Sequence, residues 1–237
     1  MPTGRVSLAL RERLRGDVNI RAAAQLREYG SVIDRIAADR PRRVLDWGCG
    51  WGYISHELLA RGLDVASTDY QPGAPGRRPS DHFPDVEVDY QADPIALPFP
   101  DASFEAVLSL GVLEHVAHPG RSLDELHRVL QPGGTLYVFK LPNRYSWLEW
   151  LARRLGLEHH GMRPDDTLYT LRSAVALVEA HGFHVRSARW ANMLPLTLPG
   201  ELASRLSGAV WALNRALARV PLLKLLSTNV ELIATRR

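Results

Sequence analysis

The chain has 237 residues, of which 46% are hydrophobic and 23% are charged, so it can bury a large core in one domain with elaborations, although two small domains would also fit. Its formal net charge of +3 comes almost entirely from evenly spread arginines, and no nucleic-acid-binding motif accompanies them, so no nucleic-acid partner is expected. The one cysteine, Cys49, excludes an internal disulfide and suits a cytoplasmic protein. The first residues do not have the charged-then-apolar pattern of a secretory leader, so secretion is not expected. No apolar run reaches the ~18 residues that span a bilayer.

Residues 5–39 are predicted to be helical, in two pieces that separate at Gly16–Asp17. Leucines and isoleucines recur there at roughly helical spacing among arginines and acids. Two placements fit this pattern. The helix packs on the edge of a sheet, or, as the family resemblance described below implies, it forms a cover whose Tyr29 and Arg27 reach the functional site.

The stretch 44–52, Val-Leu-Asp-Trp-Gly-Cys-Gly-Trp-Gly, is typical of a strand that breaks into a tight turn before a helix. Glycine tolerates positive φ and lets a ligand approach the backbone, and the helix that follows offers free N–H groups. The dinucleotide fingerprint Gly-x-Gly-x-x-Gly is absent, because its third glycine would fall on Tyr53 or on Ser55. We expect Cys49 within the turn to serve for packing rather than as a nucleophile.

A second strand is predicted over residues 63–68 and ends at Asp69, which lies 19 residues beyond Gly50. At that offset a nucleotide-type fold presents a carboxylate to ribose hydroxyls, although a strand-end cap would also place an acid there. The neighbouring Tyr70 either lies against an adenine ring or is a plain surface residue. Residues 71–84 are rich in Pro, Gly and Arg and are predicted to be a loop. A third strand is predicted over 86–90.

Residues 106–110 predict a buried fourth strand, and the segment 111–116 that follows lies where open α/β sheets carry their sites. A helix is predicted over 122–130, and a fifth strand that ends at Phe139 follows the turn at 130–134.

Three segments in this half resemble class I S-adenosylmethionine-dependent methyltransferases, and among them the ubiquinone- and menaquinone-type enzymes. They are Asp-x-Gly-x-Gly-x-Gly at 46–52, Asp-Pro-Ile-Ala-Leu-Pro-Phe-Pro-Asp-Ala-Ser-Phe at 93–104, and Leu-Gln-Pro-Gly-Gly at 130–134. The resemblance spans residues 44–140. It implies a doubly wound, Rossmann-like α/β fold with a seven-stranded, mostly parallel sheet whose last strand is antiparallel. It also implies S-adenosyl-L-methionine as cofactor and S-adenosyl-L-homocysteine as product.

The same resemblance implies which residues bind the cofactor. The turn holds the methionine part, Asp69 the ribose, and Asp93 the adenine amino group. The implied cofactor-binding residues are Asp46, Gly48, Cys49, Gly50, Gly52, Asp69, Tyr70, Asp93, Pro94 and Leu110.

His115 is the best-placed catalytic base, although a hydrogen-bonded structural histidine is an equally ordinary reason for it. The related quinone O-methyltransferases have Glu-x-x-Glu-His here, with the acids and the histidine linked to a metal. This chain has Gly111 in place of the first glutamate, so no metal is expected. The pair His159–His160 is interpreted as a surface dipeptide rather than a catalytic one.

Residues 141–170 are predicted to be a loop whose tyrosines and tryptophans line an acceptor pocket or simply join the core. A helix follows over 170–181, with strands over 183–190 and 229–234. Residues 191–228 predict a helical insertion, because Leu202, Leu206, Ala209, Leu213, Leu217 and Val220 recur at helical spacing. Packing of this stripe against the sheet is favoured over a lid, a dimer face or a membrane-surface patch.

The expected organisation is one methyltransferase domain over residues 1–237. It consists of a helical cover (1–40), a cofactor-binding core (41–190), the insertion (191–228) and the last strand (229–237). We predict methyl transfer to a small-molecule acceptor, at an oxygen atom rather than at nitrogen or carbon. The protein is expected to be a monomer or a homodimer, and peripheral contact with a membrane is compatible with the sequence. The rivals are a nicotinamide-dependent oxidoreductase, which needs the missing glycine fingerprint and a Tyr–Lys pair, and an inactive binding subunit.

Overall fold

The computed structural model describes residues 22–70, 78–91, 93–157, 159–162, 166–196 and 205–237. Residues 5–21 of the helical stretch predicted over 5–39, including its break at Gly16–Asp17, lie outside these ranges, as does Leu202 of the predicted stripe. The described part of that stretch is one helix, α2 (Ala23–Asp39).

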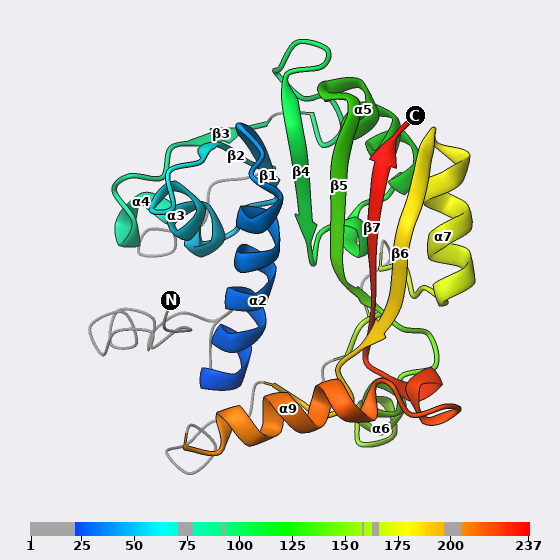
Figure 1. Ribbon diagram of the computed structural model, residues 1–237. Coiled ribbons are helices and arrows are strands. Elements are labelled where there is room, and N and C mark those ends of the chain that lie inside the picture. Colours follow the sequence, from blue (N-terminus) through cyan, green and yellow to red (C-terminus); the bar gives the residue numbers. More distant parts are fainter. Residues whose placement is uncertain (1–21, 71–77, 92, 158, 163–165, 197–204) are drawn as a thin grey trace.

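Seven strands form one sheet in the order β3-β2-β1-β4-β5-β7-β6. Only β7 runs antiparallel to its two neighbours, β5 and β6, which confirms the predicted sheet (Figure 1). The strands are β1 (Arg43–Trp47), β2 (Asp64–Asp69), β3 (Val88–Tyr90), β4 (Phe104–Leu110), β5 (Leu130–Pro142), β6 (Phe183–Ala191) and β7 (Asn229–Arg236). The strand order reverses between β1 and β4, which is where open α/β sheets bind their ligands.

Two helical layers cover the sheet. On one face α2 and α3 (Tyr53–Leu59) bury apolar side chains against β1 and β4; on the other, α5 (Pro119–Val129) and α7 (Leu171–Ala180) do so. Apolar side chains, mostly aliphatic, at spacings of three and four give each of these helices an apolar stripe for its face of the sheet. The result is the doubly wound arrangement.

Two stretches that were predicted to be loops contain helices. Residues 71–77 lie outside the described ranges, but Pro79–His82 forms the short helix α4, with Pro79 at its first turn and the Asp81 carboxylate accepting from the Arg78 N–H at 2.9 Å. Within 141–170, α6 (Trp147–Arg154) begins at Ser146, whose hydroxyl caps the Glu149 N–H at 3.2 Å. The composition of these two stretches did not indicate the helices, because the capping contacts that begin them involve only one or two residues each.

The turn at 130–134 also differs from expectation. Leu130 already pairs with Phe104, and pairing resumes at Ala106 with Thr135, so the Pro-Gly-Gly segment is an irregularity inside β5 rather than a turn before it. The predicted insertion contains α9 (Ser207–Leu217) and a 3₁₀ turn, η3 (Leu223–Leu226). Another 3₁₀ turn, η2 (Leu113–His115), follows β4.

Candidate cofactor and acceptor site

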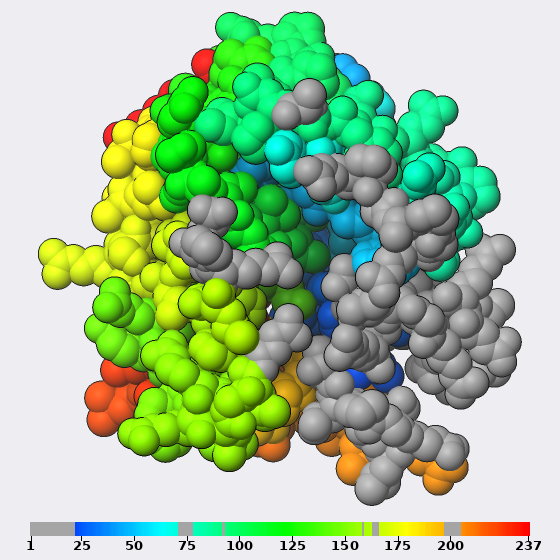
Figure 2. All heavy atoms as spheres, turned by 180° about the vertical axis from the view of Figure 1, so that it is seen from behind, coloured from blue at the N-terminus to red at the C-terminus, as the bar shows by residue number. Residues whose placement is uncertain are grey.

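A cavity of about 1000 Å³ lies at the carboxyl edge of the sheet, at the reversal between β1 and β4. Its walls come from the ends of β1, β2 and β4, from α2, and from single residues of β5 and the 159–162 segment. From behind, the molecule is hollowed between the green segments on one side and the cyan and blue segments on the other (Figure 2). The site therefore has the position that the sheet topology predicts.

The glycine turn forms the floor of this cavity. Gly48 has φ 74°, and a Cβ there would lie 2.4 Å from Cγ2 of Val112, so only glycine fits. The N–H groups of Gly48 and Cys49 both donate to the Thr68 carbonyl at 2.9 Å, which fastens the turn to β2. At Gly50, with φ 54°, a Cβ would meet no atom within 4 Å, so the backbone faces open space that a ligand can approach.

Gly52 departs from its predicted role. It caps the start of α3 at φ 75° and does not line the cavity. A Cβ there would lie 2.8 Å from Cβ of Pro79, so this glycine serves the packing of α3 against α4. Cys49 does line the cavity, and burial raises the pKa of its thiol, which agrees with a packing role.

Asp46 lies at the end of β1 and is almost completely buried. Its Oδ2 accepts from the Ser55 hydroxyl at 2.6 Å, and Ser67 in turn donates to Ser55 at 2.8 Å. Burial outweighs the Ser55 hydrogen bond and raises the pKa of this carboxyl to about 6. A carboxylate that is costly to ionise alone is a ready partner for a cationic group in the cavity.

Asp69 stands at the end of β2 and faces the same cavity. Its two oxygens accept from two backbone groups, Oδ2 from the Gly50 N–H at 2.9 Å and Oδ1 from the Tyr70 N–H at 2.7 Å. Each oxygen keeps a second lone pair, so the carboxylate is oriented to accept from a pair of hydroxyls. The Tyr70 ring is 48% exposed at the cavity rim and free to lie against a planar group.

Asp93 lies beyond β3 and also lines the cavity, as do Pro94 and Leu110. Its Oδ1 accepts from the N–H groups of Ile95 at 2.7 Å and Ala96 at 3.1 Å, and these bonds lower the pKa of the carboxyl. The group stays ionised, and Oδ2 remains to accept from a ligand.

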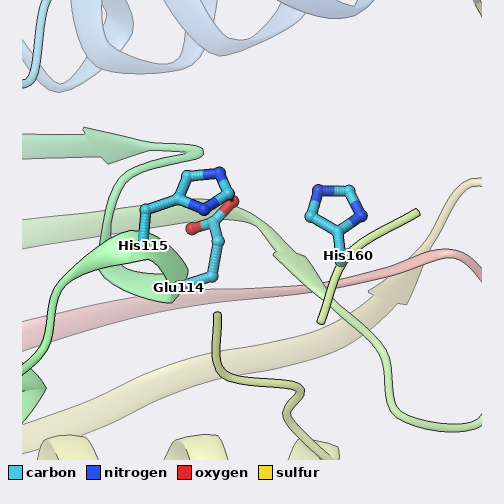
Figure 3. A group of neighbouring side chains, drawn as sticks. All are labelled: Glu114, His115 and His160. Carbon is cyan, nitrogen blue, oxygen red and sulfur yellow. Dashed lines mark ion pairs between the residues drawn. The ribbon is translucent and has the colours of Figure 1, made fainter. Parts of the chain in front are cut away.

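His115 lies in η2 and also lines the cavity. Its Nδ1 is 2.8 Å from Oδ1 of Asp166, whose side chain is only 5% exposed. Its Nε2 is 3.9 Å from Oε1 of Glu114 (Figure 3). Because an ionised carboxylate only accepts, the Asp166 contact places the hydrogen on Nδ1 and leaves Nε2 basic.

His160 was interpreted as part of a surface dipeptide, and its side chain is indeed 39% exposed, but it is exposed at the cavity. It lines the cavity, and its Nδ1 lies 2.7 Å from Oε1 of Glu149, whose Oε2 accepts from the His160 N–H at 2.9 Å. The Glu149 contact raises the pKa of His160. Its ring stacks on that of His115, with centroids 6.0 Å apart and 18° between the planes. Helix α6, which the sequence did not predict, supplies Glu149 and so holds this histidine in place.

Within the described ranges, Glu114, His115 and His160 are the group with the makings of a metal site: one ligand atom from each lies within 4.8 Å of the others. Gly111 has no side chain to act as a ligand where the related enzymes have a glutamate, and His160 provides a third ligand atom instead. One histidine is held by Asp166 and the other by Glu149, as metal-binding histidines commonly are by carboxylates. That no metal is needed remains a prediction.

Lys140, at φ 64° in β5, forms a polar wall that sequence reasoning missed. Its Nζ lies 3.4 Å from Oε2 of Glu28 and 3.4 Å from the hydroxyl of Tyr29, which also accepts from Gln25 at 3.2 Å. Burial opposes the charged form, but Glu28 and Tyr29 outweigh it and raise the pKa of the Lys140 ammonium. Of the two α2 residues expected to reach the site, Tyr29 lines the cavity, whereas Arg27 instead donates to Ser207 at 3.2 Å.

The aromatic side chains around 145–169 do not line the cavity. Tyr145 and Trp150 are exposed, Tyr169 is buried in the core, and the Trp147 indole donates to the Met193 carbonyl at 2.7 Å. The aromatic residues that do line it are Tyr29, Trp47, Trp51, Tyr53 and Tyr70.

S-adenosylmethionine fits these residues by its chemistry. Several polar atoms in the walls find no hydrogen-bond partner among the described residues; they are Thr68 Oγ1, Gln91 Nε2, Ser122 Oγ and Glu114 Oε2. Such atoms are costly to bury unpaired, so the cavity suits a polar ligand. A cationic, hydroxyl-bearing nucleoside offers partners to Asp46, Asp69 and Asp93.

Residues 45–138 match a family model described as a methyltransferase domain. The chain is 36% identical over 132 residues to a demethylmenaquinone methyltransferase of Renibacterium salmoninarum, which covers 52% of this chain and 54% of that protein. It is 29% identical over 182 residues to a ubiquinone biosynthesis O-methyltransferase of Ruegeria pomeroyi, covering 69% and 73%. The chain therefore spans only about half the length of the first of these relatives.

Among solved structures, a methyltransferase of Thermotoga maritima, described as S-adenosylmethionine-dependent and as a possible histamine N-methyltransferase, superposes with a TM-score of 0.60. The identity is 17%, and the match covers 97% of this chain and 96% of that one, so it shows the fold. Residues 45–138 thus match a methyltransferase domain, and the chain as a whole has the fold of S-adenosylmethionine-dependent methyltransferases.

Proposed function

We propose that this protein transfers the methyl group of S-adenosylmethionine to an oxygen atom of a small-molecule acceptor, with His115 as the base. The observation that carries the proposal is one cavity lined by three carboxylates, Asp46, Asp69 and Asp93, and by His115 of the His115–Asp166 pair. Bound S-adenosylmethionine would supply a sulfonium methyl group, whose carbon an acceptor atom attacks in line while the carbon–sulfur bond breaks and S-adenosylhomocysteine leaves as a thioether.

Asp46, Asp69 and Asp93 hold the cofactor along the strand ends. Asp69 accepts from the ribose hydroxyls with oxygens that Gly50 and Tyr70 already orient. Asp93 accepts from the adenine amino group through its remaining oxygen. Asp46, whose ionisation burial disfavours, gains from a cationic amino group nearby. Binding thereby fixes the direction in which the methyl group faces.

At the acceptor end, Nε2 of His115 takes the proton of the acceptor hydroxyl while the oxygen bonds to the methyl carbon. Asp166 stays ionised and stabilises the imidazolium that forms, because its Oδ1 holds the Nδ1 hydrogen. On the other side, the Lys140 ammonium and the Tyr29 hydroxyl provide donors for an oxygen that becomes negative.

A second role for the same group is favoured by one observation, the closeness of ligand atoms from Glu114, His115 and His160. With two histidines and a glutamate the donors suit zinc, and a bound hydroxyl would lose its proton to solvent more easily. The two roles differ in their response to chelators. The oxidoreductase and the inactive binding subunit gain no support from the family match.

The test is transfer of a labelled methyl group from S-adenosylmethionine to a panel of phenols, catechols, sugar hydroxyls, amines and carbon acids. Product from a hydroxyl compound, lost in His115→Gln, supports the proposal. Product from amines or carbon acids alone would contradict the choice of oxygen. The domain boundaries and the monomer-or-homodimer state remain predictions, which limited proteolysis and sedimentation would check.

A further inference from the structure

The fully buried residues of helix α9 are polar, whereas several apolar residues on and beside it are exposed. Its buried positions are Ser207 and Asn214, whereas Leu206 and Leu213 are 49% and 48% exposed. The stripe that was expected to pack on the sheet therefore points outward, and that expectation was wrong. In a surface helix that serves only the fold, the apolar stripe faces the core.

Polar contacts hold α9 in this orientation. The Asn214 side-chain oxygen accepts from the N–H groups of Met193 and Leu194, each at 2.6 Å, beyond the end of β6. Ser207 accepts from Arg27 of α2 at 3.2 Å. The outward leucines are thus a consequence of specific hydrogen bonds on the opposite face of the helix.

Neighbouring segments at the same end of the molecule also expose apolar side chains. In and beside η3, Leu222, Leu225 and Leu226 are 79%, 40% and 43% exposed. On and after α6, Trp150, Leu155 and Leu157 are 59%, 63% and 56% exposed. Among the described residues, every exposed large apolar side chain except Tyr70 and Tyr90 comes from residues 145–226. Figure 1 shows α6 and α9 at one end of the molecule, beyond the carboxyl ends of the parallel strands.

Leu222 has an unfavourable backbone conformation. Its φ of 64° and ψ of −47° are unfavourable for a residue with a side chain, and glycine would adopt them freely. The Leu222 side chain is 79% exposed, so its burial within the protein does not offset the backbone strain. The side chain instead adds apolar area to the outer surface.

The charge of this surface is positive. The sequence has no Asp or Glu between Glu201 and Glu231, yet it carries Arg205, Arg215, Arg219 and Lys224 there. Helix α6 ends with Arg153 and Arg154. Apolar side chains interspersed with arginine and bounded by tryptophan are the pattern of segments that lie in the interface of an anionic membrane.

We propose that the end formed by α6, α9 and η3 docks on the surface of a membrane that carries anionic lipid headgroups. The leucines and Trp150 enter the headgroup region, and the arginines contact the headgroup charges. Docking is peripheral, since none of the helices in the described ranges has the length and apolar character to cross a bilayer. The proposal does not depend on methyl transfer, and binding and activity can fail separately.

The experiment is flotation of the full chain with phosphatidylcholine vesicles, with and without phosphatidylglycerol. We expect binding that needs phosphatidylglycerol and weakens at high salt. Arg215→Glu with Arg219→Glu should weaken it at least ~10-fold, because each surface cation contributes about 1 kcal/mol. The matched control is Arg42→Glu with Arg237→Glu, two exposed arginines at the amino-terminal end of β1 and the carboxyl terminus, which should bind nearly as the wild type does.

A second variant tests the apolar contribution. Leu222→Gly removes the most exposed leucine and relieves its backbone, so we expect weaker vesicle binding with unchanged or higher thermal stability. S-adenosylhomocysteine binding should not change in either variant. If the wild type binds neither the vesicles with phosphatidylglycerol nor those without it, the proposal is overturned. So would a stable dimer that the Leu222→Gly variant breaks, because the surface would then be covered by a second copy.

Discussion

Nδ1 of His115 lies 2.8 Å from Oδ1 of Asp166, although 51 positions separate the two residues in the chain. The carboxylate is nearly buried, whereas the imidazole lines the cavity. The contact fixes one tautomer and leaves Nε2 facing the acceptor end. Among the ordinary explanations for this histidine, the contact therefore supports the proposed role as a positioned base.

Replacing His115 by Gln should lower kcat by about 10²–10⁴ for a hydroxyl acceptor, because the general base is lost. Asp166→Asn should lower kcat by a smaller factor, because the ring loses its orienting partner. S-adenosylhomocysteine affinity should stay within about twofold, as calorimetry would show. The pair His181 and Asp124, in contact at 2.6 Å but away from the cavity, offers a matched control. If His181→Gln lowered kcat as much as His115→Gln, the assignment would fail.

Removal of metal ions distinguishes the two roles of the Glu114 cluster. With His115 as the base, activity should survive dialysis against a strong chelator, and added zinc should inhibit by occupying Nε2. The measurement is initial rate before and after chelation, with the metal content determined by mass spectrometry. Loss of activity that zinc restores would instead assign Glu114, His115 and His160 as metal ligands.

The raised pKa of Asp46 makes a prediction about stability. The folded state holds this proton up to pH about 6, and the unfolded chain only to about 4, so the free energy of unfolding falls as pH rises between these values. The fall is about 3 kcal/mol at most, at about 1.4 kcal/mol for each pKa unit. Because Asn carries no proton equilibrium, the cofactor-free Asp46→Asn variant should gain stability over the wild type by that amount between pH 4 and 7. Urea unfolding across this range checks it, and a pH-independent difference would contradict the role of burial.

Alanine at Gly48 should be far more harmful than alanine at Gly62. Both have positive φ, 74° and 81°, so both substitutions strain the backbone by about 1–2 kcal/mol. Only at Gly48 would the new Cβ collide, with Val112 at 2.4 Å; at Gly62 nothing lies within 4 Å. We therefore expect Gly48→Ala to lose more stability and to bind S-adenosylhomocysteine weakly, whereas Gly62→Ala binds normally. Equal losses of affinity would show that the turn does not shape the cofactor site.

The cofactor half of the fold was predictable because its signals are local. A glycine that needs positive φ, an acid that ends a strand and an apolar run for a buried strand are each legible within a few residues. Asp46, Asp69 and Asp93 fall at one cavity because parallel strands end at one edge of a sheet. Gly52 shows where such local prediction fails. Its role is to pack against Pro79, which belongs to a helix that the composition did not indicate.

The acceptor half depends on contacts between distant segments, which periodicity does not encode. His160 enters the site because α6 supplies Glu149, and Lys140 becomes a cavity residue because Glu28 of α2 partners it. The stripe of α9 was recognised, but spacing alone does not say which face of a helix meets solvent. Asn214 decides that through two backbone N–H groups.

The most direct test of the account compares two aspartates of β2 by calorimetry with S-adenosylhomocysteine. Asp69 ends the strand at the cavity, and Asp64 begins it at the other edge, paired with Arg43 at 3.2 Å on the surface. We predict that Asp69→Ala lowers the affinity about 10–100-fold, as the loss of charge-assisted hydrogen bonds does, while Asp64→Ala leaves it unchanged. Wild-type affinity in Asp69→Ala, or no binding by the wild type, would contradict the assignment of this cavity to the methyl donor.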